Sequence, residues 1–265
     1  MKLLLKISYD GSAYCGSQYQ PSCPTIQGVL TEKLSEAFGF PCNVTGCSRT
    51  DAGVHAVGYV VSVEPRDISL RSDNWCRIPE DKVHTAINML LPNDIAVTGA
   101  AFVPDGFHPR YDAVAKEYRY VICDSVCPDP FMRNRAYLLK RRLDNSQIGI
   151  MNEAARHLVG KHDFSAFMAS GSSVSDTVRT LYKLEAERAA EGAVHVTALG
   201  DGFLYNMVRI LTGTILDAAF GKISPRDVPE ILASRDRSKA GHTAPACGLY
   251  LMEVRYAEKI DFKAE

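Results

Sequence analysis

The sequence has little that would suit a membrane or secreted protein. No apolar run approaches the length of about 18 residues that a membrane-spanning helix needs. The longest candidate, around residues 203–220, contains Arg209 and Asp217. At the N-terminus, the apolar run that begins at Leu3 stops at Lys6, which is too short for a signal peptide. We therefore expect a cytoplasmic protein that does not enter a membrane.

Metal and cofactor motifs are also missing. The eight cysteines include no C-x-x-C pair, and the seven histidines include no H-x-x-x-H pair. Zinc sites usually show such close pairs, and a disulfide-stabilised domain would be smaller and richer in cysteine. The chain has neither the glycine-rich loops that bind nucleotide phosphates nor the G-x-S-x-G turn of serine hydrolases. These absences predict reduced thiols, no bound metal and no cofactor.

Neither sign of charge dominates. The net charge is −1, which gives no overall signature of a nucleic-acid-binding protein. The charge is uneven, however, because residues 110–142 hold eight Lys or Arg against four Asp or Glu. The densest part is a basic cluster of Arg133, Arg135, Lys140, Arg141 and Arg142. Such a cluster is either a solvated surface or a patch that attracts RNA phosphates, and charge alone leaves both open.

What the chain does have is clear hydrophobic periodicity. In the first half, a period of two marks strands and a spacing of three or four residues marks helices. Thr25 can cap a helix that Gly39 ends, and Pro79 and Pro92 bracket a second helix. Strands are expected at residues 2–9 (half-buried), about 42–47, 57–63 and 95–103. The order strand, helix, strand, strand, helix, strand is that of a ferredoxin-like unit.

The second half repeats this order. Strands are expected at residues 117–123, 180–189, 193–199 and 248–256, and helices at 146–159, at 203–219 and from Ser224. A turn is expected at Glu191-Gly192, and residues 104–109 have the composition of a linker. We therefore predict an α+β protein with two ferredoxin-like halves, residues 1–108 and 109–265, and a cleft between them.

The segment from Ser48 to His55 stands out because it joins two expected strands. Its Asp and Gly residues make it an ordinary turn by local propensity. The second interpretation is a reactive loop, since Arg49 and Asp51 are two residues apart and can approach the same side of the backbone. A guanidinium beside the Asp51 carboxylate would keep it charged, as a nucleophile requires. Local propensity by itself favours the turn.

Arg209 and two tyrosines each allow two interpretations. Arg209 interrupts the most apolar expected helix. It either extends from the edge of the core to solvent or is a buried guanidinium that needs an anion, such as Asp51 or a phosphate. Tyr118 and Tyr120 face the same side of an expected strand, with basic residues interleaved. They are either packing residues or rings on which an unstacked base lies.

The segment Cys47-Ser-Arg-Thr-Asp-Ala-Gly-Val-His-Ala56 resembles the catalytic motif of the tRNA pseudouridine synthase A family. Further segments resemble that family in the same order along the chain, at residues 9–12, 25–28, 107–111, 116–120, 163–167, 203–209 and 243–251. The resemblance therefore covers almost the whole chain, and the run from Arg49 to His55 is highly specific.

The resemblance implies an isomerase that converts uridine to pseudouridine in the tRNA anticodon stem-loop, typically at positions 38, 39 and 40, without a cofactor. It gives Asp51 the role of nucleophile, attacking either C1′ of the ribose or C6 of the uracil. Tyr118 would stack on the target base and assist proton transfer. Arg49 and Arg209 match the family's active-site arginines, one positioning the flipped-out nucleotide and the other pairing with the aspartate.

The resemblance also implies partners and further contacts. Thr50 and His55 lie in the same motif and are expected to contact the substrate. The family works as a homodimer with tRNA lying across both subunits, so tRNA and a second copy of the chain are the expected partners. One position departs from the family's pattern: Ser17 stands after Gly16, where relatives commonly carry tryptophan. The departure leaves the catalytic motif intact.

The alternative to an active enzyme is a catalytically idle or altered-specificity RNA-binding paralogue on the same architecture. An idle descendant would be free to lose any of Arg49, Asp51, Tyr118 and Arg209, and all four are present. A small-molecule enzyme on ferredoxin-like domains is a third hypothesis. It predicts weak tRNA binding that does not depend on salt, because phosphate contacts make affinity fall with salt.

Overall fold

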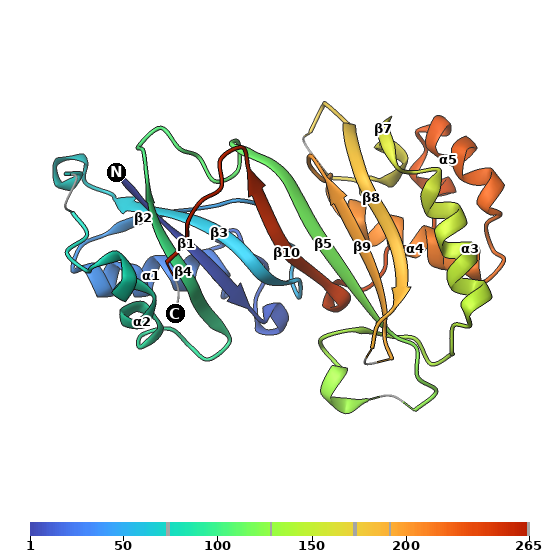
Figure 1. Ribbon diagram of the computed structural model, residues 1–265, viewed down its shortest axis with the longest axis horizontal. Coiled ribbons are helices and arrows are strands. Elements are labelled where there is room, and N and C mark those ends of the chain that lie inside the picture. Colours follow the sequence, from blue (N-terminus) through green and yellow to red (C-terminus); the bar gives the residue numbers. More distant parts are fainter. Residues whose placement is uncertain (73–74, 128, 172–173, 191, 264–265) are drawn as a thin grey trace. The chain divides into compact units, whose positions relative to one another are not determined.

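The computed structural model describes residues 1–72, 75–127, 129–171, 174–190 and 192–263 (Figure 1). It confirms the α+β class, and the predicted strands and helices are present in the predicted order. The chain divides into two compact units. Unit 1 comprises Met1–Val114 together with the residues from Leu251 onward, and unit 2 comprises Ala115–Tyr250.

Unit 1 contains the first strand and helix set. Its elements are β1 (Lys2–Tyr9), α1 (Ile26–Phe38), β2 (Cys42–Gly46), β3 (His55–Pro65), α2 (Glu80–Asn88) and β4 (Ile95–Val103). The strands pair antiparallel in the order β4-β1-β3-β2. Strands joined through a helix are thus separated by one antiparallel neighbour, which is the split βαβ arrangement of a ferredoxin-like unit.

The first strand is more deeply buried than its alternation predicts. Leu3, Leu5 and Ile7 are fully buried on the predicted face, but Leu4 on the opposite face is fully buried too. β1 is also paired along both of its edges, with β3 and with β4. It is therefore covered more completely than the half-buried strand that the sequence predicts.

Both predicted caps of α1 are present. The Thr25 hydroxyl accepts the Gly28 N–H at 3.2 Å, and Gly39 ends the helix with a φ of 76°. The first turn of α1 is also tied to the preceding loop. Ile26 N–H donates to the Gly16 carbonyl at 3.2 Å, and Gln27 N–H donates to the Ser17 carbonyl at 3.0 Å. The loop before α1 is therefore fixed in place by the helix that follows it.

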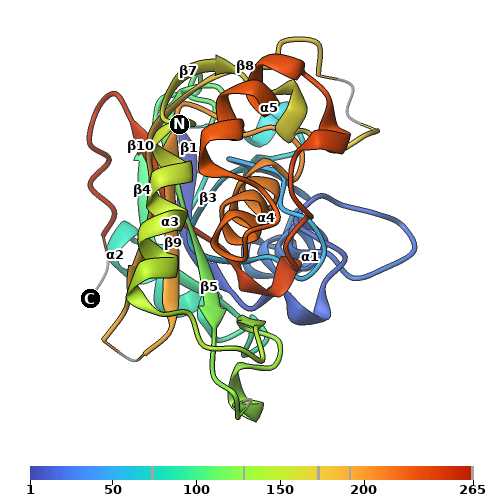
Figure 2. The ribbon, with the colours of Figure 1, turned by 90° about the vertical axis from the view of Figure 1, so that its right-hand side faces the viewer.

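Unit 2 carries the second set of elements, and Figure 2 turns its helices toward the viewer. They are β5 (Ala113–Cys123, of which the first two residues belong to unit 1), β6 (Tyr137–Leu138), α3 (Asn145–Arg156), β7 (Gly160–Asp163), β8 (Val178–Arg188), β9 (Val194–Gly200), α4 (Met207–Ala219) and α5 (Val228–Ser234). The strands run in the order β5-β9-β8-β7, with β6 parallel to β5, and α3 packs against α4 and β8.

Several details of unit 2 differ from the prediction. The helix expected to reach residue 159 ends at Arg156, and the short strands β6 and β7 were not predicted. The helix expected from residue 203 begins at Met207, because Asn206 before it is left-handed with a φ of 59°. Of the turn expected at Glu191-Gly192, Gly192 has a φ of 89° and Glu191 lies outside the described residues.

The boundary between the units also differs from the predicted division at residues 108 and 109. Residues 109–114 and the last strand, β10 (Leu249–Tyr256), from Leu251 onward belong to unit 1. β10 pairs with β3 so closely that a Cβ on Gly58 would lie 2.3 Å from the Met252 carbonyl oxygen. The Tyr256 hydroxyl also donates to the Pro109 carbonyl at 2.9 Å. These contacts return the C-terminal segment to the first unit.

Candidate active site

The segment that carries Asp51 connects β2 to β3 and is held at both ends. Cys47 N–H donates to the Val60 carbonyl at 2.9 Å, and the Tyr59 hydroxyl donates to the Ser48 carbonyl at 2.5 Å. From Asp51 to Val54 the chain makes a β-turn, in which Val54 N–H donates to the Asp51 carbonyl at 3.2 Å. Gly53 supplies the positive φ, 78°, that the third position of a type II turn requires. The turn interpretation is confirmed, and Asp51 stands at the first position of the turn.

Thr50, next to Asp51, is fixed by hydrogen bonds on three of its atoms. Its N–H donates to the Ser17 hydroxyl at 2.8 Å, and its carbonyl accepts the Ser17 N–H at 3.0 Å. Its own hydroxyl lies 2.9 Å from the Tyr9 hydroxyl. Thr50 and Ser17 are buried, so these bonds are shielded from water. These bonds fix the backbone directly before Asp51, whereas the predicted substrate contact of Thr50 stays a prediction.

A glycine makes the close approach of Ser17 and Thr50 possible. Gly16 has a φ of 97°, and a Cβ at this residue would lie 2.6 Å from the Thr50 carbonyl oxygen. Both the left-handed backbone and the lack of space select glycine here. The loop before α1 therefore lies directly against the segment that holds Asp51.

His55 supports the same segment from its other end. Only 2% of its surface is exposed, and its Nδ1 accepts the Gly11 N–H at 3.1 Å. The Asp10 carboxylate lies 3.2 Å from the same nitrogen. This geometry ties the start of β3 to the turn that follows β1, which favours a structural role for a residue expected to contact substrate.

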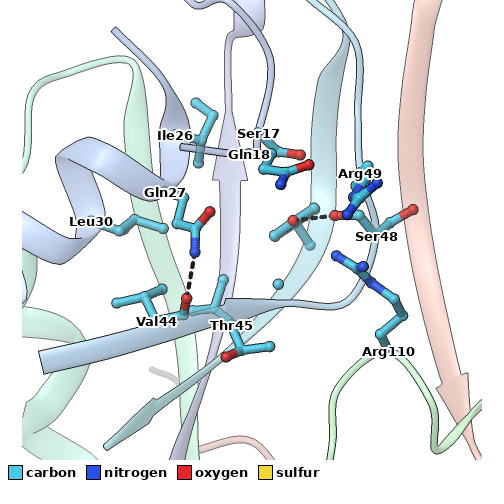
Figure 3. Close-up of a pocket in the computed structure, with 13 residues that line it drawn as sticks. Ser17, Gln18, Ile26, Gln27, Leu30, Val44, Thr45, Ser48, Arg49 and Arg110 are labelled. Carbon is cyan, nitrogen blue, oxygen red and sulfur yellow. Dashed lines mark hydrogen bonds between the residues drawn. The ribbon is translucent and has the colours of Figure 1, made fainter. Parts of the chain in front are cut away.

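Asp51 and Arg49 do not form the neighbouring charge pair that their spacing suggested. Asp51 is half-buried, whereas Arg49 is exposed and forms no ion pair within the described part of the chain. The Arg49 side chain instead lines a cavity between the first turn of α1, β2 and Arg110 (Figure 3). Asp51 and Arg49 do not pair because the turn begins at Asp51. The side chains of Arg49 and Asp51 therefore leave stretches of backbone that run in different directions.

Tyr118 and Arg209 lie in unit 2. Tyr118 is on β5 opposite Ala198 of β9, is buried, and packs edge to face on Phe203 with ring centroids 5.1 Å apart. Its companion Tyr120 is fully buried and donates its hydroxyl proton to the Pro245 carbonyl at 2.7 Å. Burial raises the pKa of Tyr120 far above its usual range. Tyr120 is therefore a packing residue, which decides one of the two alternatives left by the sequence.

Arg209, on the first turn of α4, is half-buried and directed at backbone and amide oxygens. Its Nε donates to the Ala244 carbonyl at 2.8 Å, and its Nη1 donates to the Asn206 side chain at 2.7 Å. Ala244 N–H in turn donates to the Arg209 carbonyl at 3.1 Å. The guanidinium therefore links α4 to the segment before β10 and is held in one orientation.

No metal or membrane feature accompanies these residues. Within the described residues, no three His, Cys, Asp or Glu side chains come together as a metal site requires. All eight cysteines are free thiols. None of the helices in the described ranges has the length and apolar character needed to cross a bilayer.

Comparison with known proteins agrees with this arrangement. The family model described as tRNA pseudouridine synthase matches residues 6–112 and 154–257. The chain is similar to tRNA pseudouridine synthase A of Bacillus subtilis, with 44% identity over 97% of this chain and 99% of that protein. It is 43% identical to the protein of that name from Ruminiclostridium cellulolyticum, over 96% of this chain and 99% of the relative. Such similarity along the full length shows that the chain belongs to the tRNA pseudouridine synthase family.

Two residues near Asp51 were not singled out as functional by the sequence. Ser17 was noted only as a departure from the family's pattern, and its bond to Thr50 joins residues 33 positions apart. Arg110 lies in a segment that resembles the family but carried no chemical signal of its own. Neither could be found from local spacing, because both act through contacts between distant parts of the chain.

Proposed function

We propose that this protein converts uridine to pseudouridine in the anticodon stem-loop of tRNA, at positions 38, 39 and 40. The observation that carries the proposal is the placement of Asp51 on a turn fixed by Ser17, Tyr9 and Tyr59, within a chain of the tRNA pseudouridine synthase family. A rigid turn at the end of sheet strands is a suitable support for a reactive carboxylate.

The chemistry of the reaction fits the residues available. The N1–C1′ bond of uridine breaks and a C5–C1′ bond forms, while C5 loses a proton and N1 gains one. Nothing is oxidised or reduced, so a nucleophile, a proton carrier and groups that hold the nucleotide out of its stack are sufficient. We assign the nucleophile to Asp51, base stacking and proton transfer to Tyr118, and nucleotide positioning to Arg49 and Arg209.

The two arginines have different surroundings and therefore suit different parts of this role. Arg49 is exposed and without an ion pair in the described residues, so it is available to RNA. Arg209 is already oriented by Ala244 and Asn206, so it can present its charge without first losing side-chain freedom. We propose that Thr50 and His55 act mainly by holding the segment around Asp51. We also propose that the protein is a homodimer that binds tRNA in the cytoplasm.

The direct test is to incubate the purified protein with unmodified tRNA and to map pseudouridine by sequencing after chemical labelling. We expect modification at uridines 38, 39 and 40, and none in the acceptor stem. Tight, salt-dependent tRNA binding without any pseudouridine would support an idle paralogue instead. Weak binding that does not vary with salt would support a small-molecule enzyme.

A further inference from the structure

Unit 1 contains a cavity of about 150 Å³ beside the Asp51 segment, here called the α1 cavity (Figure 3). One wall is aliphatic and comes from Ile26 and Leu30 of α1 and from Val44 of β2. The opposite side is polar and carries Ser48, together with two arginine side chains. Asp51 is not among the lining residues, so this space is distinct from the position of the nucleophile.

The charge around the α1 cavity is unbalanced. Its lining holds two guanidinium groups, Arg49 and Arg110, and no aspartate or glutamate. The Nε of Arg110 is buried and has no hydrogen-bond partner within the described chain. Figure 3 shows both arginine side chains directed toward the space between them and Ser48. Two cations that share a lining without a carboxylate make a site for an anion.

The segment that carries Arg110 is built to hold it there. The Nδ1 of His108 accepts the N–H groups of Arg110 and Tyr111 at 3.1 and 3.3 Å. The Asp112 carboxylate accepts the His108 N–H at 2.8 Å. Together with the bond from Tyr256 to the Pro109 carbonyl, these contacts fix the backbone on both sides of Arg110. The Nε of its side chain, which lines the cavity, has no hydrogen-bond partner among the described residues.

Gln27 and the first turn of α1, which also border the cavity, already use their hydrogen-bonding groups. Gln27 donates from its side-chain nitrogen to the Val44 carbonyl at 2.7 Å and accepts the Tyr19 N–H at 2.9 Å. The first backbone N–H groups of α1 donate to the carbonyls of Gly16 and Ser17. The helix N-terminus therefore adds no unused donor, and the anion must be held by side chains.

We propose that the α1 cavity binds a phosphodiester of the RNA substrate between Arg49 and Arg110, with the adjoining sugar or base against the aliphatic wall. This rests on the proposed action on tRNA and adds Arg110 as a substrate-binding residue. The bound phosphate would be one that flanks the reacting uridine, and it would fix the register of the RNA strand beside Asp51. Planar guanidinium groups suit this role because each can donate two parallel hydrogen bonds to phosphate oxygens.

The test measures binding of an anticodon stem-loop RNA as a function of salt, using Asp51→Ala protein so that no product forms. For Arg110→Gln we expect about tenfold weaker binding, and a slope of log affinity against log salt reduced by about one. Arg66→Gln is the matched control, because Arg66 is an exposed arginine of unit 1 outside the cavity. It should change neither quantity.

Two further measurements separate this role from a structural one. Because Arg110 has no internal partner at Nε, Arg110→Gln should keep or raise the melting temperature. If Arg49 and Arg110 share one phosphate, the double variant Arg49→Gln/Arg110→Gln should lose RNA affinity by a factor clearly smaller than the product of the factors lost by the two single variants. A lowered melting temperature with an unchanged salt slope would overturn the proposal.

The source of the phosphate is tested with uridine monophosphate as competitor. If uridine monophosphate displaces the stem-loop from the parent protein only at concentrations far above that of the RNA, the result supports a phosphodiester of a polynucleotide as the ligand of the cavity. Tight binding of uridine monophosphate, with the RNA salt slope unaffected by Arg110→Gln, would assign the cavity to a free nucleotide and overturn the proposal. A parent protein that binds no RNA contradicts the proposed function itself, whereas binding that is indifferent to Arg110 contradicts this inference alone.

Discussion

At the residue scale, the position of Asp51 depends on a hydroxyl group far away in the sequence. Ser17 accepts the Thr50 N–H and donates its own N–H to the Thr50 carbonyl, so it holds the residue before the nucleophile on both sides. A tryptophan, which the family resemblance leads one to expect at this position, has no side-chain acceptor for that N–H. This chain therefore fixes the segment around Asp51 with a side-chain contact that a tryptophan could not make.

Ser17→Ala tests this contact. It leaves the buried Thr50 N–H without its partner, which should cost about 1–3 kcal/mol of unfolding free energy. The looser segment should lower kcat about 10- to 100-fold, with a smaller effect on KM for tRNA. Ser17→Thr, which keeps the oxygen, should recover most of the rate, and exposed Ser22→Ala serves as the matched control. Equal kcat for the Ala and Thr variants would argue against a positioning role.

At the element scale, a buried ion pair joins three parts of unit 2. Asp124, which follows β5, accepts two hydrogen bonds from Arg188 at the end of β8, at 2.7 and 2.9 Å. It also accepts the Leu143 N–H at 2.8 Å, just before α3. Burial alone would raise the pKa of Asp124, but Arg188 and the backbone donor outweigh it and hold that pKa below its ordinary value.

Arg188→Met is expected to lower the unfolding free energy by about 3–5 kcal/mol, because it leaves a buried carboxylate without its partner. The folded-state pKa of Asp124 is below its unfolded value, so its stabilising effect is present above about pH 3.9 and is lost as the pH falls through the folded pKa. Denaturant melts from pH 7 to pH 3 should therefore show that the unfolding free energy falls less steeply with decreasing pH in Arg188→Met than in the parent.

The control for this pair is Lys183→Met, which removes an exposed pair with Glu185 on the same strand. Exposed pairs contribute about 0–1 kcal/mol, so this variant should melt almost as the parent does. If both substitutions lower the unfolding free energy by similar amounts, the burial of the Asp124–Arg188 pair does not make it more stabilising than an exposed pair.

The basic cluster lies on both sides of the short strand β6, with two arginines before it and three basic residues between it and α3. Arg133, Arg135, Lys140, Arg141 and Arg142 are all exposed, and Arg141 lies over the Phe220 ring at 4.6 Å. If the cluster tracks phosphates, Lys140→Glu with Arg142→Glu should weaken binding to tRNAs of any sequence and reduce the salt slope by about two. Unchanged affinity in filter-binding assays would identify the cluster as a solvated surface.

The success of sequence reasoning for these elements has a physical cause. α1 was predicted with its ends because Thr25 and Gly39 act locally, within one turn of the helix. β7, with the sequence Gly-Lys-His-Asp, was missed because it has no apolar alternation and forms only by pairing with β8. Within the candidate site, Asp51 and Arg49 were found from their motif, whereas the contacts of Ser17 and Arg110 depend on tertiary packing.

At the scale of the whole molecule, the two units are not two consecutive blocks, because the residues from Leu251 onward belong to unit 1. The sequence predicted the order of the strands and helices, but it placed the boundary at residue 108, because nothing local shows that β10 returns to β3. The predicted homodimer is tested by sedimentation equilibrium, where the dimer mass should persist at the concentrations used for activity. A monomer with full activity would exclude a shared tRNA site.

The central claim is that Asp51 performs the nucleophilic step on a tRNA uridine. The most direct measurement compares pseudouridine formation and stem-loop binding for the parent protein and for Asp51→Ala. We expect the substitution to reduce product formation below detection while the affinity for RNA stays within about threefold of the parent, a difference of less than 1 kcal/mol. Pseudouridine formed by Asp51→Ala at a rate comparable to the parent would contradict the account.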